Sequence, residues 1–198
     1  MSILTRIRLN KEQAYQIPDS YAWHQYLWQA FPDRPDEERS FLFRVDETSI
    51  NVTVLMLSVH EPTVQPLGFW ESKTVGDAFL SHQTYSFDLR VNPTVRDHKT
   101  RRRYGIVHED MLQQWMIRKS ELSGFQTDIA ELAITAPRKE FFYKQGDGKS
   151  SQRGMHISVD FKGVLTVTNR EAFIQAFQMG IGSAKAFGFG LLMLQPLS

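Results

Sequence analysis

The chain has 198 residues, of which 41% are hydrophobic, and its formal net charge is +1. This length and apolar content predict either one large domain or two small ones with packed cores. The absence of cysteine excludes disulfides, thiolate catalysis and zinc–thiolate sites. No apolar run is long enough to cross a bilayer, and the first residues alternate charged and aliphatic side chains instead of forming a signal peptide, so we expect a cytoplasmic protein.

Hydrophobic periodicity predicts an α+β chain. In the N-terminal half we expect a helix over about 19–31 and strands at 3–9, 39–45, 51–59 and 83–91. In the C-terminal half we expect helices at 109–122 and 170–179 and strands at 128–134, 139–144, 155–161, 163–168 and 189–196. The economical interpretation is two small α+β domains, at 1–95 and 109–198, which are joined by a linker at 96–108. Each domain is expected to be a sheet with helices on one face.

The two halves of the chain carry opposite net charge. Residues 1–90 have 8 Lys and Arg against 12 Asp and Glu, whereas residues 91–198 have 15 against 10. A basic face on an otherwise neutral protein is the usual electrostatic footprint of nucleic-acid binding. Ordinary surfaces also segregate charge, so composition alone leaves both interpretations open.

The predicted linker, within "VNPTVRDHKTRRRYGIVHE", is dense in arginine and contains one opposing carboxylate, Asp97, inside the cluster. Guanidinium groups make planar, bidentate contacts with phosphate, so we expect a basic loop or hairpin that lies along a phosphate backbone. The alternative is a solvated linker. The expected contact residues are Arg96, Lys99, Arg101, Arg102 and Arg103.

A second basic cluster surrounds "GDGKSSQRG" at 146–154, whose glycines predict a turn or flexible loop. The cluster is either a second phosphate contact or a hairpin tip kept soluble by its charge. Its members are Arg138, Lys139, Lys144, Lys149 and Arg153.

Tyr21 and His24 are the candidate catalytic pair. They lie three residues apart in "DSYAWHQYLWQAF", so they share one face of a helix that Asp19 or Ser20 can cap. The alternative is that both side chains pack beside neighbouring aromatic residues. No histidine has the spacing or the clustered carboxylates of a metal site.

Glycines crowd the C-terminal stretch "GIGSAKAFGFGLL", from Gly180 to Leu192. Such a run suits positive φ angles and close approach of the backbone to a partner. Four other segments precede this stretch in the chain: "YAWHQYLWQAFPDRPDEERSFLFRV", "LRVNPT", the arginine-rich loop and "GDGKSSQRGMHISVDFKGVLTV". In the order and spacing of these five segments, the chain resembles the CasE family of CRISPR precursor-RNA processing endoribonucleases. The resemblance covers nearly the whole length, and the glycine-rich tail is a hallmark of repeat-associated RNA-binding proteins.

The resemblance implies tandem ferredoxin-like domains that bind the stem-loop of a CRISPR repeat and cut at the base of the stem without metal or cofactor. The RNA 2′-hydroxyl would attack the adjacent phosphorus and leave a 2′,3′-cyclic phosphate, and the product would stay bound as part of a Cascade-type complex. His24 is then the general base or acid and Tyr21 its partner. The implied RNA-binding residues are those of the loop together with Arg138, Lys149, Arg153, Gly180, Gly182, Lys185, Gly188 and Gly190.

The sequence departs from the family pattern in two places. Some relatives carry a basic residue one turn beyond the histidine, where this chain has Gln25 and Gln29, so transition-state charge is expected to be offset by Lys149 or a loop arginine. Relatives often have a lysine soon after the "NP" motif, where this chain has Val95.

Alternatives to this function and to the role of the glycines stay open. The chain could be a catalytically inactive RNA-binding subunit or a protein-interaction module. The tail glycines could serve packing between the domains instead of RNA contact. To separate these two roles we expect Gly188→Val to fit the final strand and to impair RNA binding alone.

Overall fold

The computed structural model describes residues 1–33, 41–144 and 152–197, and the chain forms two compact units. Both are built on antiparallel sheets with helices, which confirms the predicted α+β class. Unit 1 comprises Met1–Gly76, Phe141–Gly154 and Lys185–Gly188, and unit 2 comprises Asp77–Glu140, Met155–Ala184 and Phe189–Ser198.

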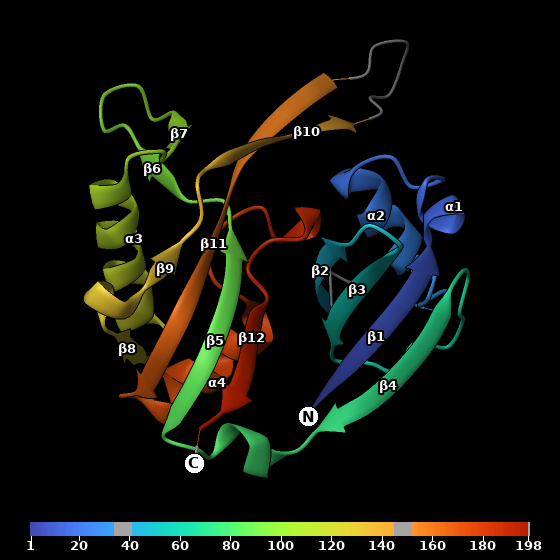
Figure 1. The fold of residues 1–198 in the computed structure, drawn as a ribbon, viewed down its shortest axis with the longest axis horizontal. Coiled ribbons are helices and arrows are strands. Elements are labelled where there is room, and N and C mark those ends of the chain that lie inside the picture. Colours follow the sequence, from blue (N-terminus) through green and yellow to red (C-terminus); the bar gives the residue numbers. More distant parts are fainter. Residues whose placement is uncertain (34–40, 145–151, 198) are drawn as a thin grey trace. The chain divides into compact units, whose positions relative to one another are not determined.

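The sheet of unit 1 has the order β2-β3-β1-β4, formed by β2 (Phe41–Glu47), β3 (Asn51–Ser58), β1 (Ser2–Asn10) and β4 (Phe69–Val75). Counted along the chain this is the strand order 4-1-3-2 of a ferredoxin-like sheet. The short helix α1 (Lys11–Ala14) follows β1, and α2 (Ser20–Trp28) precedes β2 (Figure 1).

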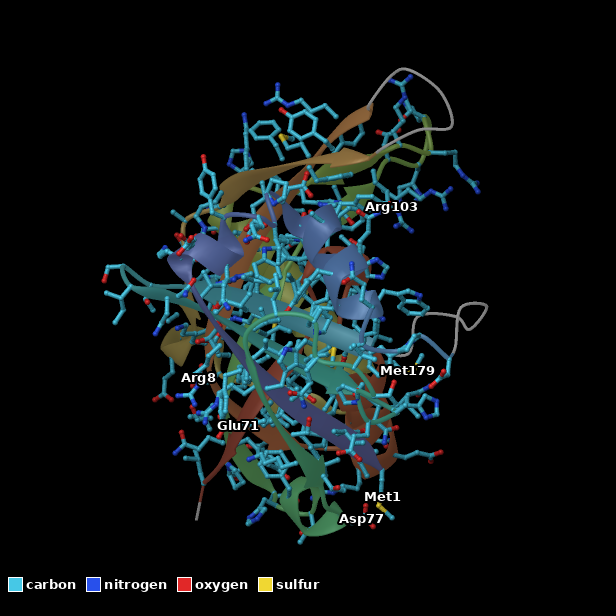
Figure 2. The ribbon with its side chains drawn as sticks, turned by 90° about the vertical axis from the view of Figure 1, so that its right-hand side faces the viewer. Met1, Arg8, Glu71, Asp77, Arg103 and Met179 are labelled. Atoms are coloured by element: carbon cyan, nitrogen blue, oxygen red, sulfur yellow. The ribbon has the colours of Figure 1, made fainter. Side chains whose placement is uncertain are left out.

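Alternation along the strands decides which side chains of unit 1 are buried. Ile7 and Leu9 of β1 join one core cluster with Trp23 and Leu27 of α2. The intervening arginines point to the opposite face, where Arg8 lies 3.4 Å from Glu71 on the neighbouring strand (Figure 2). A hydrogen bond from Arg6 lowers the pKa of the Glu71 carboxyl. This sheet therefore has one apolar and one charged face.

The sheet of unit 2 has the order β10-β11-β5-β12, again the ferredoxin-like order. Its strands are β10 (Arg138–Lys144), β11 (Gln152–Val167), β5 (Thr84–Val91) and β12 (Leu192–Pro196), and β8 (Phe125–Thr127) and β9 (Ala133–Ile134) also pair with β11. The helices are α3 (Glu109–Leu122) and α4 (Arg170–Met179), with 3-10 turns η1 (Asp77–Leu80), η2 (Ile129–Glu131) and, in unit 1, η3 (Lys185–Phe187).

Aromatic contacts hold both helices of unit 2 to its sheet. Trp115 of α3 stacks on Phe161 of β11 with ring centroids 6.0 Å apart. Phe173 of α4 lies 5.3 Å from the ring of Tyr85 on β5 and 6.4 Å from that of Phe125. All five side chains are at most 3% exposed, so they form the core beneath the two helices.

The arginine-rich segment is a short hairpin made of β6 (Thr94–Arg96) and β7 (Arg103–Gly105), which pair antiparallel. The strand at 84–91, which the sequence places in the N-terminal half, pairs with β11 and β12 and lies in unit 2. No helix in the described ranges is long and apolar enough to span a membrane.

Candidate functional site

Helix α2 carries both candidate catalytic residues, and Asp19 fixes where it begins. Asp19 has extended backbone angles, and its Oδ1 accepts hydrogen bonds from the backbone N–H groups of Tyr21 and Ala22, each at 2.9 Å. This satisfies two of the donors that a helix start leaves without an internal partner. The predicted cap is therefore correct, and it holds Tyr21 in the first turn of the helix.

Tyr21 and His24 are both half-buried in aromatic surroundings. The Tyr21 ring lies 6.2 Å from that of Phe187 in η3. The His24 imidazole stacks on Trp28 at 6.0 Å and lies 5.5 Å from Phe41 at the start of β2. These contacts restrict the imidazole to a narrow range of orientations, as both a packing role and a catalytic role require.

The β10–β11 hairpin meets the same helix through Phe142. The Phe142 ring lies 4.3 Å from that of Phe187, which in turn neighbours Tyr21. Gly154 makes room for this ring on the opposite strand, since a Cβ there would lie only 2.1 Å from Phe142 Cζ. A row of three aromatic side chains thus connects the hairpin, the glycine-rich segment and the first turn of α2, all within unit 1.

Asp19 makes a second, direct connection to the hairpin. Its other carboxylate oxygen, Oδ2, accepts a hydrogen bond from the backbone N–H of Tyr143 in β10 at 2.9 Å. One carboxylate therefore joins helix α2 to β10, the strand that carries part of the second basic cluster. The sequence identifies Asp19 as a cap but gives no signal for this bond, because its partners are 124 positions apart.

The arginine-rich hairpin is organised by Asp97. Its carboxylate accepts hydrogen bonds from the N–H groups of Lys99 and Thr100 and from the Thr100 hydroxyl, and these bonds, chiefly those from Thr100, lower the pKa of Asp97. Arg101 has a positive φ of 61° within this turn. Asp97 thus shapes the turn, and the side chains of Lys99, Arg101, Arg102 and Arg103 are exposed around it.

The remaining predicted basic residues lie in different places. Arg138 begins β10, and its Nη2 lies 3.6 Å from Asp160 Oδ2. Arg153 places its guanidinium 4.0 Å from the ring centre of Phe141, across the β10–β11 hairpin. Lys185 is half-buried at the start of η3, and Lys149 lies outside the described residues.

The tail glycines fit closely against the protein itself. Gly180, Gly182, Gly188 and Gly190 all have positive φ. Gly190 has no room for a side chain, because a Cβ there would lie 2.7 Å from the Ile181 carbonyl oxygen. Gly188 precedes β12 with φ +85°, and its Cβ would lie 3.3 Å from Phe43, so the expectation that valine fits a strand at this position is wrong. Tight packing explains Gly188 and Gly190, whereas for Gly180 and Gly182 the positive φ is the reason that glycine is favoured. RNA contact by the segment stays a prediction.

No group of three His, Asp or Glu side chains in the described ranges is arranged to hold a metal ion. The site consists of a capped helix with a tyrosine and an imidazole, tied to a hairpin that carries Arg153. This chemistry suits proton transfer next to a phosphate group.

The chain is similar to known proteins over most of its length. The family model described as CRISPR associated protein matches residues 3–196. The chain is 34% identical to the CRISPR system Cascade subunit CasE of Escherichia coli K12, over 90% of this chain and 93% of that protein. It is 25% identical to the CRISPR-associated endoribonuclease Cse3 of Thermus thermophilus, over 98% and 99% of the two chains.

Solved structures confirm the tandem ferredoxin-like fold. A structure of CRISPR endoribonuclease Cse3 bound to a 19-nucleotide RNA superposes with a TM-score of 0.84, at 23% identity and over 99% of this chain and 100% of that one. Cas6e from Escherichia coli K-12 superposes with a TM-score of 0.71, at 30% identity and over the whole of both chains. The chain therefore belongs to the CasE/Cse3/Cas6e family of CRISPR-associated proteins.

Proposed function

We propose that this protein is a metal-independent endoribonuclease that binds the stem-loop of a CRISPR repeat and cleaves the precursor RNA at the base of the stem. The products are a 2′,3′-cyclic phosphate and a free 5′-hydroxyl. After cleavage the protein keeps the stem-loop and serves as a subunit of a Cascade-type complex. The names of two relatives support the proposed cleavage and the proposed place in a complex, since one is named a Cascade subunit and the other an endoribonuclease.

The observation that carries the proposal is the placement of Tyr21 and His24 on one capped helix joined to the β10–β11 hairpin. Asp19 bonds to both the helix start and Tyr143, and Phe142 reaches Tyr21 through an intervening phenylalanine. An RNA that contacts the hairpin would thereby be held in register with the two side chains. Positioning of this kind lowers the entropic part of a reaction barrier.

The chemistry needs two proton transfers. The 2′-hydroxyl loses a proton as its oxygen bonds to phosphorus, and the departing 5′-oxygen gains one as its bond to phosphorus breaks. Imidazole is suited to either transfer because its ordinary titration range lies near neutral pH. We assign one of these two proton transfers to His24. We assign to the Tyr21 hydroxyl the role of orienting or protonating the reacting oxygen on which His24 does not act.

Negative charge also accumulates on the phosphorus oxygens during the attack. Gln25 and Gln29, on the turn that follows His24 in the chain, are neutral. The compensating cation must therefore come from elsewhere, and Lys149 or an arginine of the β6–β7 hairpin is our candidate. A weakly stabilised transition state makes the reaction slow, which suits an enzyme that cuts once and retains its product.

The same neutral glutamines favour a second candidate function, that of an RNA-binding subunit without nuclease activity. In that case His24 is only a packing residue beside Trp28 and Phe41. This candidate shares all the binding predictions and differs in cleavage alone.

One experiment separates the two. The purified protein is incubated in excess chelator with the repeat RNA of its own CRISPR array, and with the same RNA carrying a single 2′-deoxynucleotide before the cleavage site. We expect the first RNA to yield a cyclic phosphate and a 5′-hydroxyl, and the second to be bound but not cut. Equal cleavage of both RNAs, or a 5′-phosphate product, would refute the 2′-hydroxyl mechanism, and binding without cleavage of either would favour the inactive subunit.

A further inference from the structure

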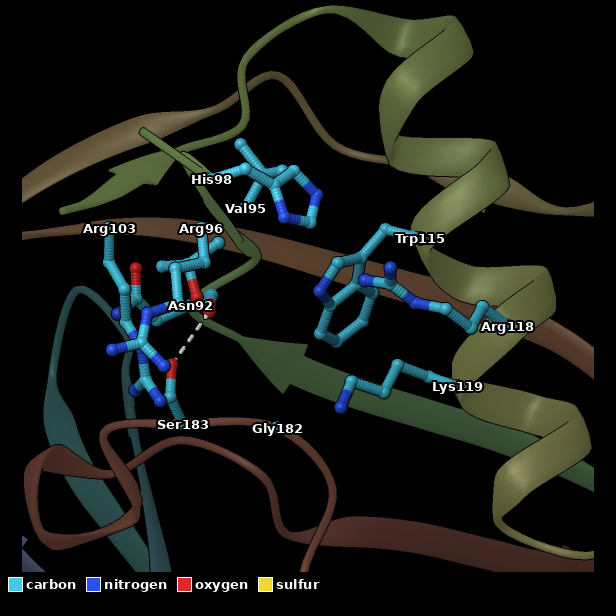
Figure 3. A pocket seen from close by; sticks show the side chains of 11 residues that line it. Asn92, Val95, Arg96, His98, Arg103, Trp115, Arg118, Lys119, Gly182 and Ser183 are labelled. Carbon is cyan, nitrogen blue, oxygen red and sulfur yellow. Dashed lines mark hydrogen bonds between the residues drawn. The ribbon is translucent and has the colours of Figure 1, made fainter. Parts of the chain in front are cut away.

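A basic pocket of about 480 Å³ lies within unit 2, between the β6–β7 hairpin, helix α3 and the turn after α4. Arg96 and Arg103 line it from the hairpin and Arg118 and Lys119 from α3, with Trp115 between them (Figure 3). Its volume is typical of a pocket for a small ligand or one unit of a polymer. Four cationic side chains from two separate elements thus line a single hollow.

No carboxylate of the described residues neutralises the charge of this pocket. The lining contains no carboxylate, and within the described part of the chain no acidic side chain pairs with Arg103, Arg118 or Lys119. The nearby carboxylate of Asp97 is engaged by Lys99 and Thr100 in the hairpin turn.

The positively charged side chains of this pocket also repel one another, which destabilises the folded protein. Arg96 and Arg103 are direct cross-strand partners, and like charges in that position destabilise a hairpin. Burial and the charges of Arg118 and Arg103 lower the pKa of the Lys119 ammonium. Such repulsion is relieved when an anion enters.

The pocket is built on well-packed residues. Trp115 is 3% exposed, and the Lys119 ammonium lies 5.8 Å from its ring centre. Opposite, Ser183 donates its hydroxyl hydrogen to the carbonyl oxygen of Asn92 at 3.2 Å, and a Cβ on Gly182 would lie 3.4 Å from Trp115. The tryptophan face is therefore largely covered, so it is a wall of the pocket and not a stacking surface for a base.

We propose that this pocket binds a backbone phosphodiester of the RNA, held by Arg96 and Arg103 from one side and Arg118 and Lys119 from the other. Phosphate fits better than a planar base, because the ring is covered and the cationic groups of the lining are hydrogen-bond donors. The Arg96 Nε–H donates to the Arg101 carbonyl oxygen at 3.2 Å, which leaves the terminal nitrogens of this guanidinium for phosphate. Guanidinium groups contact phosphate oxygens in pairs, and a lysine adds a point charge. The inference rests on the proposed function and extends it. It adds Arg118 and Lys119 of α3 to the RNA-binding residues, and it assigns Arg96 and Arg103 of the hairpin to one defined phosphate site.

The test compares charge removal in the pocket with charge removal elsewhere. Affinity for the repeat stem-loop RNA of the protein's own array is measured between about 50 and 300 mM salt for the parent, Arg118→Gln, Lys119→Gln and the double variant. Lys73→Gln is the matched control, because Lys73 is exposed on β4 of unit 1. Arg118→Lys with Lys119→Arg keeps the charge, and thermal unfolding checks that all variants fold.

We expect each pocket substitution to weaken binding about tenfold and to lower the slope of log affinity against log salt by about one. The control and the charge-preserving variant should retain the parental slope. If the parent binds the RNA and the double variant has the same affinity and slope, the pocket holds no phosphodiester, although the proposed function stands. If the parent itself does not bind, the proposed function fails and the inference fails with it.

A second arm distinguishes RNA from a free anion. The indole N–H signal of Trp115, assigned with Trp115→Phe, is followed by NMR during titration with the repeat RNA or with inorganic phosphate. We expect the RNA to shift this signal at micromolar concentration and phosphate to shift it only at millimolar concentration. A shift by micromolar phosphate that RNA neither reproduces nor competes with would assign the pocket to a free anion and overturn the proposal.

Discussion

Replacing Asp19 by Asn should uncouple helix α2, which carries the candidate catalytic residues, from the β10–β11 hairpin without removing the cap. Asn keeps one carbonyl oxygen for the N–H groups of Tyr21 and Ala22, and Asn and Asp cap helices about equally well. Its amide nitrogen cannot accept the hydrogen bond from the Tyr143 N–H, which now goes to a carboxylate oxygen at 2.9 Å. The variant therefore loses one hydrogen bond, which lies at an exposed position of β10.

The expected cost in stability is small and the expected cost in cleavage is larger. Losing one such bond destabilises the fold by about 1 kcal/mol, which for a chain of this size lowers the melting temperature by about 2–4 °C. Asp19→Ala also loses the cap, so it should cost about 2 kcal/mol in total. We expect Asp19→Asn to slow single-turnover cleavage at least tenfold, because loosened positioning reduces the rate at constant affinity.

Asn169→Ala supplies the matched control for this experiment. Asn169 caps α4 in unit 2 by accepting a hydrogen bond from the Ala172 N–H at 3.1 Å, and it touches none of the candidate catalytic residues. Its loss should cost about 1 kcal/mol of stability and leave the cleavage rate unchanged. The reasoning is refuted if Asp19→Asn cuts as fast as the parent, or if the control slows cleavage equally.

Three further outcomes are expected. Tyr21→Phe should slow cleavage and leave affinity unchanged, because it keeps the ring contact and removes only the hydroxyl; a parental single-turnover rate would exclude Tyr21 from the mechanism. Replacing the three arginines at 101–103 by Ala should weaken binding to all stems alike and flatten its salt dependence, whereas unchanged affinity and slope would make this turn a solvated linker. Gly188→Val should destabilise the fold by about 1–2 kcal/mol because of its positive φ, and a parental melting temperature would contradict the packing role.

Much of the fold follows from the sequence because its periodic segments are long. Helix α2 was predicted over 19–31 and is observed at Ser20–Trp28, with Asp19 as its cap. The strand β4 was not predicted, since only Trp70 and Val75 of its seven residues are buried and the rest are polar or exposed. Charged edge strands give little hydrophobic signal.

The prediction for the longest strand, β11, is wrong because Gly163 was interpreted as a break between two strands. Two strands were expected at 155–161 and 163–168, but β11 runs without a break over Gln152–Val167. Gly163 lies within the ladder opposite Phe87, where a Cβ would approach Leu132 to 3.3 Å. The glycine permits close packing of a neighbour, which a sequence cannot distinguish from a turn. Similarly, the strand expected at 128–134 is divided between the 3-10 turn η2 (Ile129–Glu131), capped by Asp128, and the short strand β9 (Ala133–Ile134).

The candidate site was predictable where it is local and not where it joins distant segments. The spacing of Tyr21 and His24 and the arginine density are visible in the sequence. The bond from Tyr143 to Asp19 and the contact of Phe142 with Phe187 depend on tertiary structure alone. Arg118 and Lys119 had a weak signal, because they follow Trp115 by one helical turn.

The most direct test of the central claim is the single-turnover cleavage rate of His24→Ala on the repeat stem-loop RNA in chelator, with affinity measured on the same preparation. If His24 transfers a proton in the reaction, cleavage should be abolished while the dissociation constant stays within a few fold of the parent. Cleavage at the parental rate by this folded variant, or loss of folding and binding together, would show that the imidazole only packs against Trp28 and Phe41.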